Sequence, residues 1–279
     1  MSTHHNFCQA LQMFRTLFIR AKSYLRRAGP RFEGQPPKPD HPLAVIGDLH
    51  GQAVGLERML ARLSDQASNH HWIFLGDYVD RGPHSKDVLL RLHELCQTRP
   101  NTTCLIGNHE EMLLRFLDEP DADKLLAHGP KWQHVGGAQT LESFGVILPT
   151  PKSGNGSLEQ AQVQSQLRDA IPPDIQKWLR QLPRKFVSGN VATVHAGADP
   201  SLPIEEQPHM TLTCGHHSFG VQARTDGMWV VHGHTVVPVP REENGVISID
   251  TGAFRNGRLT TALIADGMIE YIQVDCEDS

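Results

Sequence analysis

The first half of the chain repeats one plan three times, and this repetition constrains the fold more than any other feature. Each unit has a short apolar run, a glycine followed by polar residues, and apolar residues at helical spacing. The apolar runs are Leu43–Ile46, Trp72–Leu75 and Thr103–Ile106. Runs of this length are typical of strands that are buried on both faces. Because strands that alternate with helices favour a parallel sheet with right-handed crossovers, we predict an α/β fold.

Polar side chains follow each of these runs. The three segments are Gly47-Asp48-Leu49-His50-Gly51, Gly76-Asp77-Tyr78-Val79-Asp80-Arg81-Gly82 and Gly107-Asn108-His109-Glu110. Gly and Asp are also common in ordinary surface turns, but the recurrence of the pattern favours a functional site. Because loops after parallel strands gather at the carboxyl edge of the sheet, we expect these side chains to lie close together.

The plan returns in the last third of the chain. Apolar runs at 191–194, 228–231 and 246–249 end in His195-Ala196-Gly197, His232-Gly233-His234-Thr235 and Asp250-Thr251-Gly252. Helical patterns are missing between these runs, so we expect a second, mostly antiparallel sheet. Residues 259–264 and 268–274 predict a β-hairpin around a short polar turn.

Two segments do not follow the plan. Residues 1–42 are interpreted as a basic N-terminal arm and a Pro-rich linker, with six basic residues and no acid between Arg15 and Arg31. A basic amphipathic segment can lie on an anionic membrane, but we favour an arm that is solvated or packed on the domain and dispensable for catalysis. Residues 43–279 form the predicted domain. Within it, the polar stretch 118–190, with helices expected at 158–170 and near 175–182, is interpreted as a helical insertion that covers the site.

Composition narrows the class of protein. The chain has 279 residues, of which 39% are hydrophobic and 20% charged, as in a soluble globular protein. The formal net charge of −5 gives no reason to expect nucleic acid as a partner. The five cysteines form no Cys-x-x-Cys pair, which argues against a disulfide framework. We therefore predict a cytoplasmic protein.

The residue types at the strand ends are those of a metal site. Asp48 and His50 are two positions apart, a spacing that lets both side chains leave a strand end on one side, and Asp77 can give an oxygen to each of two ions. The predicted ligands are Asp48, His50, Asp77, Asn108, His195 and His234. This set has no thiolate, so it suits Mn, Fe or Zn in a reactive centre better than a structural zinc site. Two ions about 3.5–4 Å apart can clamp an in-line displacement at phosphorus.

These motifs, in this order and spacing, resemble those of the calcineurin-like metallophosphoesterases. They are most similar to the phosphoprotein phosphatase group, which includes bacterial and phage serine/threonine phosphatases. The resemblance runs from about Leu43 to Val274. It implies a β-sandwich of mixed sheets flanked by helices, with two divalent ions, Mn most favoured, at its edge. One ion would be held by Asp48, His50 and Asp77, and the other by Asp77, Asn108, His195 and His234.

The resemblance also implies roles for other residues. A metal-bound hydroxide would attack phosphorus in line, while His109 would protonate the leaving oxygen. Asp80 would orient the His109 ring, and Arg81 would bind the phosphate. In many bacterial relatives a second phosphate-binding arginine follows the strand that ends in His-Ala-Gly. The corresponding stretch here, 212–219, has none, and His216 is our candidate for part of that role.

The sequence therefore predicts a metal-dependent phosphomonoesterase, in particular a serine/threonine protein phosphatase acting on phosphorylated proteins or peptides. The alternative is a hydrolase of nucleotides such as diadenosine polyphosphates on the same centre. Those relatives tend to depart from Asp-Arg-Gly, so the intact Asp80-Arg81-Gly82 favours proteins. A non-catalytic phosphate-binding or scaffold protein is the remote alternative, since it would need a lost ligand and none of the six is missing.

Overall fold

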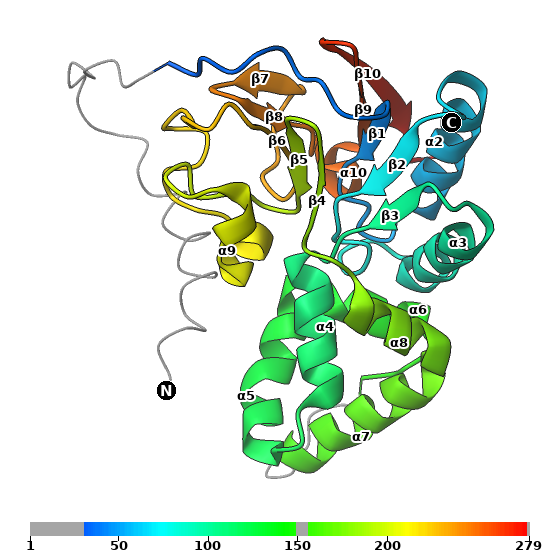
Figure 1. The fold of residues 1–279 in the computed structure, drawn as a ribbon. Helices are drawn as coiled ribbons and strands as arrows, with labels where there is room; N and C mark the ends of the chain where they lie inside the picture. The colour runs from blue at the N-terminus through cyan, green and yellow to red at the C-terminus, as the bar shows by residue number, and fades with distance from the viewer. Residues whose placement is uncertain (1–30, 149–155, 278–279) are drawn as a thin grey trace. The chain divides into compact units, whose positions relative to one another are not determined.

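Two five-stranded sheets pack face to face in the computed structural model, which describes residues 31–148 and 156–277 (Figure 1). The first sheet has the order β10-β9-β1-β2-β3. Its strands are β1 (Leu43–Ile46), β2 (His71–Phe74), β3 (Thr102–Cys104), β9 (Arg258–Ala265) and β10 (Met268–Asp275). The three strands of the repeated units are parallel, as predicted. The predicted hairpin, β9–β10, joins this sheet through antiparallel pairing of β9 with β1.

The second sheet has the order β4-β5-β6-β8-β7. Its strands are β4 (Lys185–Ser188), β5 (Val191–Val194), β6 (Trp229–His232), β7 (Arg241–Glu243) and β8 (Val246–Ser248). The expectation of a mostly antiparallel sheet is wrong, because β5, β6 and β8 are parallel and only the edge strands β4 and β7 are antiparallel. The β5–β6 crossover contains only η2 (Ile204–Glu206) and α9 (His209–Cys214) as regular helices. Helices this short leave no periodic pattern in the sequence, so the parallel direction of β5 and β6 could not be predicted from it.

Alternating side chains of the first sheet build two apolar layers. Leu43 and Val45 of β1 point into the core between the sheets, whereas Ala44 and Ile46 point toward the helices. The helices α2 (Ala53–Gln66) and α3 (Ser85–Thr98) cover that outer face with their buried leucines. Burial on both faces explains why the sequences of these strands are continuous apolar runs. It also holds in place the strand ends at which the polar loops begin.

Helices occupy most of the segment predicted as a helical insertion (Figure 1). They follow α4 (Asn108–Asp118), the helix of the third repeated unit, and they are α5 (Ala122–Trp132), η1 (Gln133–Gly137), α6 (Ala138–Ser143), α7 (Gly156–Ala170) and α8 (Pro173–Gln181). The last two match the helices predicted at 158–170 and near 175–182, whereas α5 and α6 were not predicted. Helix α5 packs on α4 and α7. The domain boundaries themselves stay a prediction.

The chain that leads into β1 is docked on the domain. Phe32 lies edge-on to Trp229 with ring centroids 4.9 Å apart, and the Trp229 indole donates a hydrogen bond of 2.8 Å to the Gln35 carbonyl. Gly267 in the β9–β10 turn donates to the Pro37 carbonyl at 3.0 Å. The basic arm and its membrane contact lie in residues 1–30, outside the described residues. No helix within 31–148 and 156–277 has the length and apolar character that crossing a membrane requires.

These contacts predict two different outcomes for two truncations. Removing residues 1–31 is expected to leave the melting temperature unchanged and kcat/KM within a few-fold of the parent. Removing residues 1–40 should also spare kcat/KM, but it removes the Trp229 and Gly267 hydrogen bonds and the Phe32 packing. The expected loss is about 2 kcal/mol, or about 4–8 °C in melting temperature. Thermal unfolding measured beside kcat/KM checks this, and equal melting temperatures for both truncations would contradict it.

Candidate active site

Strained backbone marks the loops that follow the strands. Five non-glycine residues there have a positive φ: His50 (43°), Asp77 (51°), Asp80 (72°), Arg81 (69°) and His234 (58°). In the described chain, the other such residues are Asn244 and Asp266, which lie in the turns of β-hairpins. Each strained residue costs about 1–3 kcal/mol and persists only where its surroundings fix it. Five of the predicted site residues are therefore held in unusual conformations at the ends of the strands.

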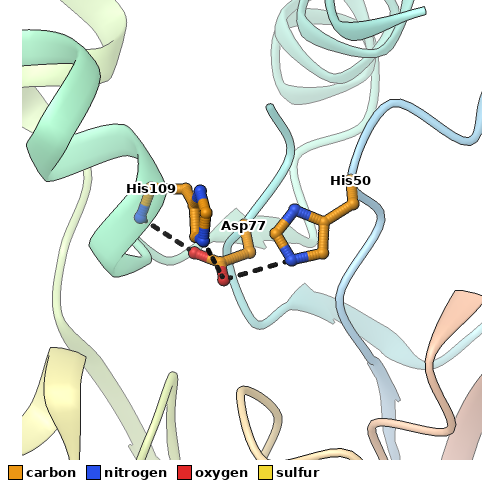
Figure 2. A group of neighbouring side chains, drawn as sticks. All are labelled: His50, Asp77 and His109. Atoms are coloured by element: carbon orange, nitrogen blue, oxygen red, sulfur yellow. Dashed lines mark hydrogen bonds and ion pairs between the residues drawn. The ribbon is translucent and has the colours of Figure 1, made fainter. Parts of the chain in front are cut away.

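Asp77 lies at the centre of the cluster. Its Oδ2 is 3.4 Å from Nε2 of His50, and its Oδ1 is 3.3 Å from Nε2 of His195. Figure 2 shows the carboxylate between His50 and His109, whose backbone N–H donates to Oδ1 at 3.0 Å. Because each oxygen faces a different imidazole, one carboxylate can serve two ions, and the bridging role of Asp77 stays a prediction.

Backbone carbonyls set the tautomers of two of these imidazoles. Nδ1 of His50 donates to the Val79 carbonyl at 2.8 Å, and Nδ1 of His195 donates to the Leu75 carbonyl at 3.0 Å. Each ring therefore presents Nε2 to the Asp77 carboxylate, the arrangement typical of metal-ligating histidines. Nε2 of His195 also lies 3.0 Å from Oδ1 of Asn108. Asp77, Asn108 and His195, three of the four predicted ligands of the second ion, thus lie close together.

Two buried atoms indicate that these residues fit divalent cations. Oδ1 of Asp48 and Nε2 of His50 have no hydrogen-bond partner within the described part of the chain. The other oxygen of Asp48 accepts the backbone N–H of His234 at 2.9 Å. An unpartnered buried carboxylate oxygen costs several kcal/mol unless a cation neutralises it. Nitrogen and oxygen atoms that could bind a metal lie within 4.8 Å of one another in two groups. One group is His50, Asp77 and His109, and the other is Asp77, His195 and His234.

The charges of the cluster also favour cations. Burial, reinforced by the neighbouring Asp250, raises the pKa of Asp48 well above its ordinary value. Burial alone would lower the pKa of His195, but Asp77 and Asp48 raise it to about 10. Burial and the charge of His195 lower the pKa of His234 to about 3. Because such side chains must lose their protons to bind a metal, metal ions and protons compete for these residues.

His109, Asp80 and Arg81 form a second group beside the ligands. Nδ1 of His109 donates to Oδ2 of Asp80 at 2.6 Å, and a terminal nitrogen of Arg81 lies 3.1 Å from Nε2 of His109. Both nitrogens of His109 are thus engaged by other side chains, so we do not count it among the ligands. The Arg81 guanidinium lies over the Phe254 ring, 4.4 Å from its centroid. The group can hold a proton and an anion next to the metal ligands.

The structure does not bring His216 to this group. Its Nε2 lies 3.6 Å from Oδ2 of Asp199, and among the described residues no contact joins it to Arg81. Arg224, which stands several positions later, is 2% exposed and donates to the carbonyls of Asp199 and Leu202. Arg224 therefore ties loops together. The phosphate-binding role of His216 stays a prediction.

Sequence reasoning missed the role of Glu110. Its buried carboxylate accepts the backbone N–H groups of Asp77, Tyr78, Val79 and Gly107 at 2.7–3.2 Å. It thereby fixes the loop after β2 to the start of α4. Its position in the first turn of a predicted helix was the available signal, because a glutamate three residues into a helix often binds backbone N–H groups at the helix start. Asp250 directly follows the apolar run 246–249 and so shared the pattern of the predicted ligands, whereas Phe254 gave no comparable signal.

Comparisons with known proteins agree with this geometry. The family model described as calcineurin-like phosphoesterase matches residues 41–238. A bis(5'-nucleosyl)-tetraphosphatase (asymmetrical) of Oceanobacillus iheyensis is 27% identical over 239 residues, covering 77% of this chain and 86% of that protein. Serine/threonine-protein phosphatase 2 of Escherichia coli is 39% identical over 88 residues, covering 32% and 38%.

The fold agrees as well. A solved structure described as a candidate diadenosine tetraphosphatase has a TM-score of 0.58 and 22% identity, covering 84% of this chain and 94% of that one. At this identity the similarity shows a shared fold. The family model covers well over half of the sequence, and the residues that it spans contain all six predicted ligands. The chain therefore belongs to the calcineurin-like phosphoesterase family.

Proposed function

We propose that the protein hydrolyses bis(5'-nucleosyl) polyphosphates. The observation that carries this proposal is the extent of similarity: a relative named for this activity aligns over 77% of the chain, whereas the serine/threonine phosphatase aligns over 32%. Because loops outside the shared motifs carry substrate contacts, similarity over the whole length is the better guide to substrate. It outweighs the intact Asp80-Arg81-Gly82, which favoured phosphoproteins in the sequence alone.

The residues of the site suit attack at phosphorus. The six predicted ligands would hold two divalent ions, Mn being our first choice for an oxygen and nitrogen ligand set. When bound, the ions supply Lewis-acid charge and make a water molecule more acidic. Arg81 binds phosphate oxygens through its planar fork of N–H donors. Asp80 stabilises the imidazolium form of His109, which gives its Nε2 proton to the leaving oxygen and becomes neutral.

The His109–Asp80 pair also favours a second candidate, a phosphomonoesterase that acts on phosphoserine or phosphothreonine in proteins. A serine or threonine alkoxide is a poor leaving group and requires a proton. A nucleotide phosphate, whose second pKa is near 6, leaves more readily. The 2.6 Å hydrogen bond between His109 and Asp80 therefore suits the more demanding leaving group.

A substrate comparison tests the proposal. Diadenosine tetraphosphate, a phosphothreonine peptide and p-nitrophenyl phosphate are assayed with Mn²⁺ at equal enzyme concentration, with chelator-treated enzyme as the blank. We expect kcat/KM for the dinucleotide to exceed that for the peptide by at least about tenfold, the scale of discrimination that a few pocket contacts supply. A tenfold preference for the peptide would instead establish the second candidate.

A further inference from the structure

The carboxylate of Asp80 is fully buried and accepts three side-chain hydrogen bonds. Oδ2 accepts from Nδ1 of His109 at 2.6 Å and from Nε1 of Trp132 at 2.9 Å, and Oδ1 accepts from the Thr140 hydroxyl at 2.7 Å. Trp132 ends α5 and Thr140 lies in α6. Two of the three donors therefore come from a segment 52 and 60 residues further along the chain.

We propose that Trp132 and Thr140 are positioning residues for the reaction: they orient the Asp80 carboxylate and, through it, the imidazole of His109. The proposal rests on the proposed function only in that His109 acts as the proton donor. A buried carboxylate is costly unless its oxygens are hydrogen-bonded. The two donors fill the positions that His109 leaves open, so the carboxylate has one orientation. The Nδ1–H of His109 then has one acceptor to face.

The same segment also holds the backbone of this loop. The Asp80 N–H donates to the hydroxyl oxygens of Thr140 at 2.9 Å and Ser85 at 3.1 Å, and the Arg81 N–H donates to the Gly136 carbonyl at 3.1 Å. Gly136 has a φ of 128°, and a Cβ there would lie 2.5 Å from the Arg81 nitrogen. A side chain at 136 would therefore push the insertion away from the loop.

These contacts explain how Asp80 and Arg81 keep positive φ angles of 72° and 69°. Strained backbone of this kind persists only where neighbours fix it, and here the neighbours are residues 136 and 140 of the insertion. Helix α5 in turn packs on α7. The insertion is thus a structural part of the proton-donating group, and it does more than cover the site.

Thr140 allows a clean test because valine has nearly its shape without the hydroxyl. Thr140→Val is expected to lower kcat about tenfold on an alkyl monoester such as phosphothreonine, but less than about threefold on p-nitrophenyl phosphate. The nitrophenolate needs little protonation, whereas general acid catalysis contributes about 10²–10⁴-fold on a poor leaving group. Thr140→Ser keeps the hydroxyl and should recover most of the loss. Equal losses on both substrates, or an equally impaired serine variant, would overturn the proposal.

Trp132 provides an independent variant. Trp132→Phe removes the indole N–H but keeps an aromatic ring against Phe116, whose centroid is 4.8 Å away. Its matched control is Trp72→Phe, because Trp72 is equally buried and its indole donates to the Ala67 carbonyl at 2.9 Å. We expect only Trp132→Phe to reproduce the dependence on the leaving group. If both variants lose activity to the same extent on both substrates, Trp132 acts through packing alone.

A substrate-free measurement separates this inference from the proposed function. The Nδ1 proton of His109, held by Asp80, should give a downfield proton NMR signal that disappears in His109→Asn. We expect the signal to be shifted or broadened in Thr140→Val and Trp132→Phe, and retained in Thr140→Ser and Trp72→Phe. An unchanged signal in both test variants would refute the positioning role, whatever substrate the protein hydrolyses.

Discussion

Asp77→Asn is expected to abolish hydrolysis and to weaken metal binding by at least about 100-fold. The two oxygens of Asp77 face His50 and His195 at 3.4 and 3.3 Å, so an amide in its place offers one oxygen where two are needed. Loss of a residue that only supports a ligand costs about 10–100-fold in metal affinity, and loss of a shared ligand should cost more.

Metal analysis after dialysis, together with kcat on p-nitrophenyl phosphate, measures both effects. Asp266→Asn is the matched control, because Asp266 also has a positive φ, of 48°, but lies in the β9–β10 turn away from the predicted ligands. That variant should keep parent metal content and activity. If Asp77→Asn retained two equivalents of metal and remained active, Asp77 would not be the shared ligand.

His109→Asn is expected to lower kcat by about 10²–10⁴-fold on an alkyl phosphate such as phosphoserine, and far less on p-nitrophenyl phosphate. The reason is the 2.6 Å hydrogen bond to Asp80, which makes His109 suited to supply a proton. Steady-state kinetics on the two substrates, with metal content checked in parallel, gives the comparison. Asparagine cannot transfer a proton, whereas it can still hydrogen-bond to Asp80.

The control for this substitution is His70→Asn, since His70 lies in the turn before β2 and its ring bonds Asn69 at 2.9 Å. It should behave like the parent on both substrates. Equal losses on both substrates for His109→Asn would mean that His109 positions the substrate or a ligand and supplies no proton.

The ligands could be predicted from the sequence because each follows a short apolar run that is buried on both faces. The apolar run Leu43–Ile46 has the same bounds as β1, and Asp48 and His50 follow it. Residues that follow parallel strands lie at the same edge of the sheet, so their proximity can be predicted once the strands are recognised. The tautomers of His50 and His195 depend on carbonyls 29 and 120 residues away, and no local pattern shows them.

Contacts over long chain separation account for the other misses. The Trp132–Asp80 hydrogen bond joins residues 52 positions apart, and the sequence shows only an apolar side chain near a Gly-Gly pair. The direction of β6 relative to β5 was missed because α9, in the connection between them, has only six residues and leaves no periodic pattern. His216 lies beside Asp199, and its phosphate-binding role stays a prediction.

The site takes its ligands from two sheets, and this has a consequence for the assembly of the fold. Asp48, His50 and Asp77 follow strands of the first sheet, whereas His195 and His234 follow strands of the second. An ion bound to both sets fastens the sheets together at their edge and has no equivalent site in the unfolded chain. Saturation at 100 times the dissociation constant would add about 2.7 kcal/mol to folding stability. If the proposed ions bind there, the supply of divalent metal would set how firmly the two sheets stay together, as well as the rate of hydrolysis.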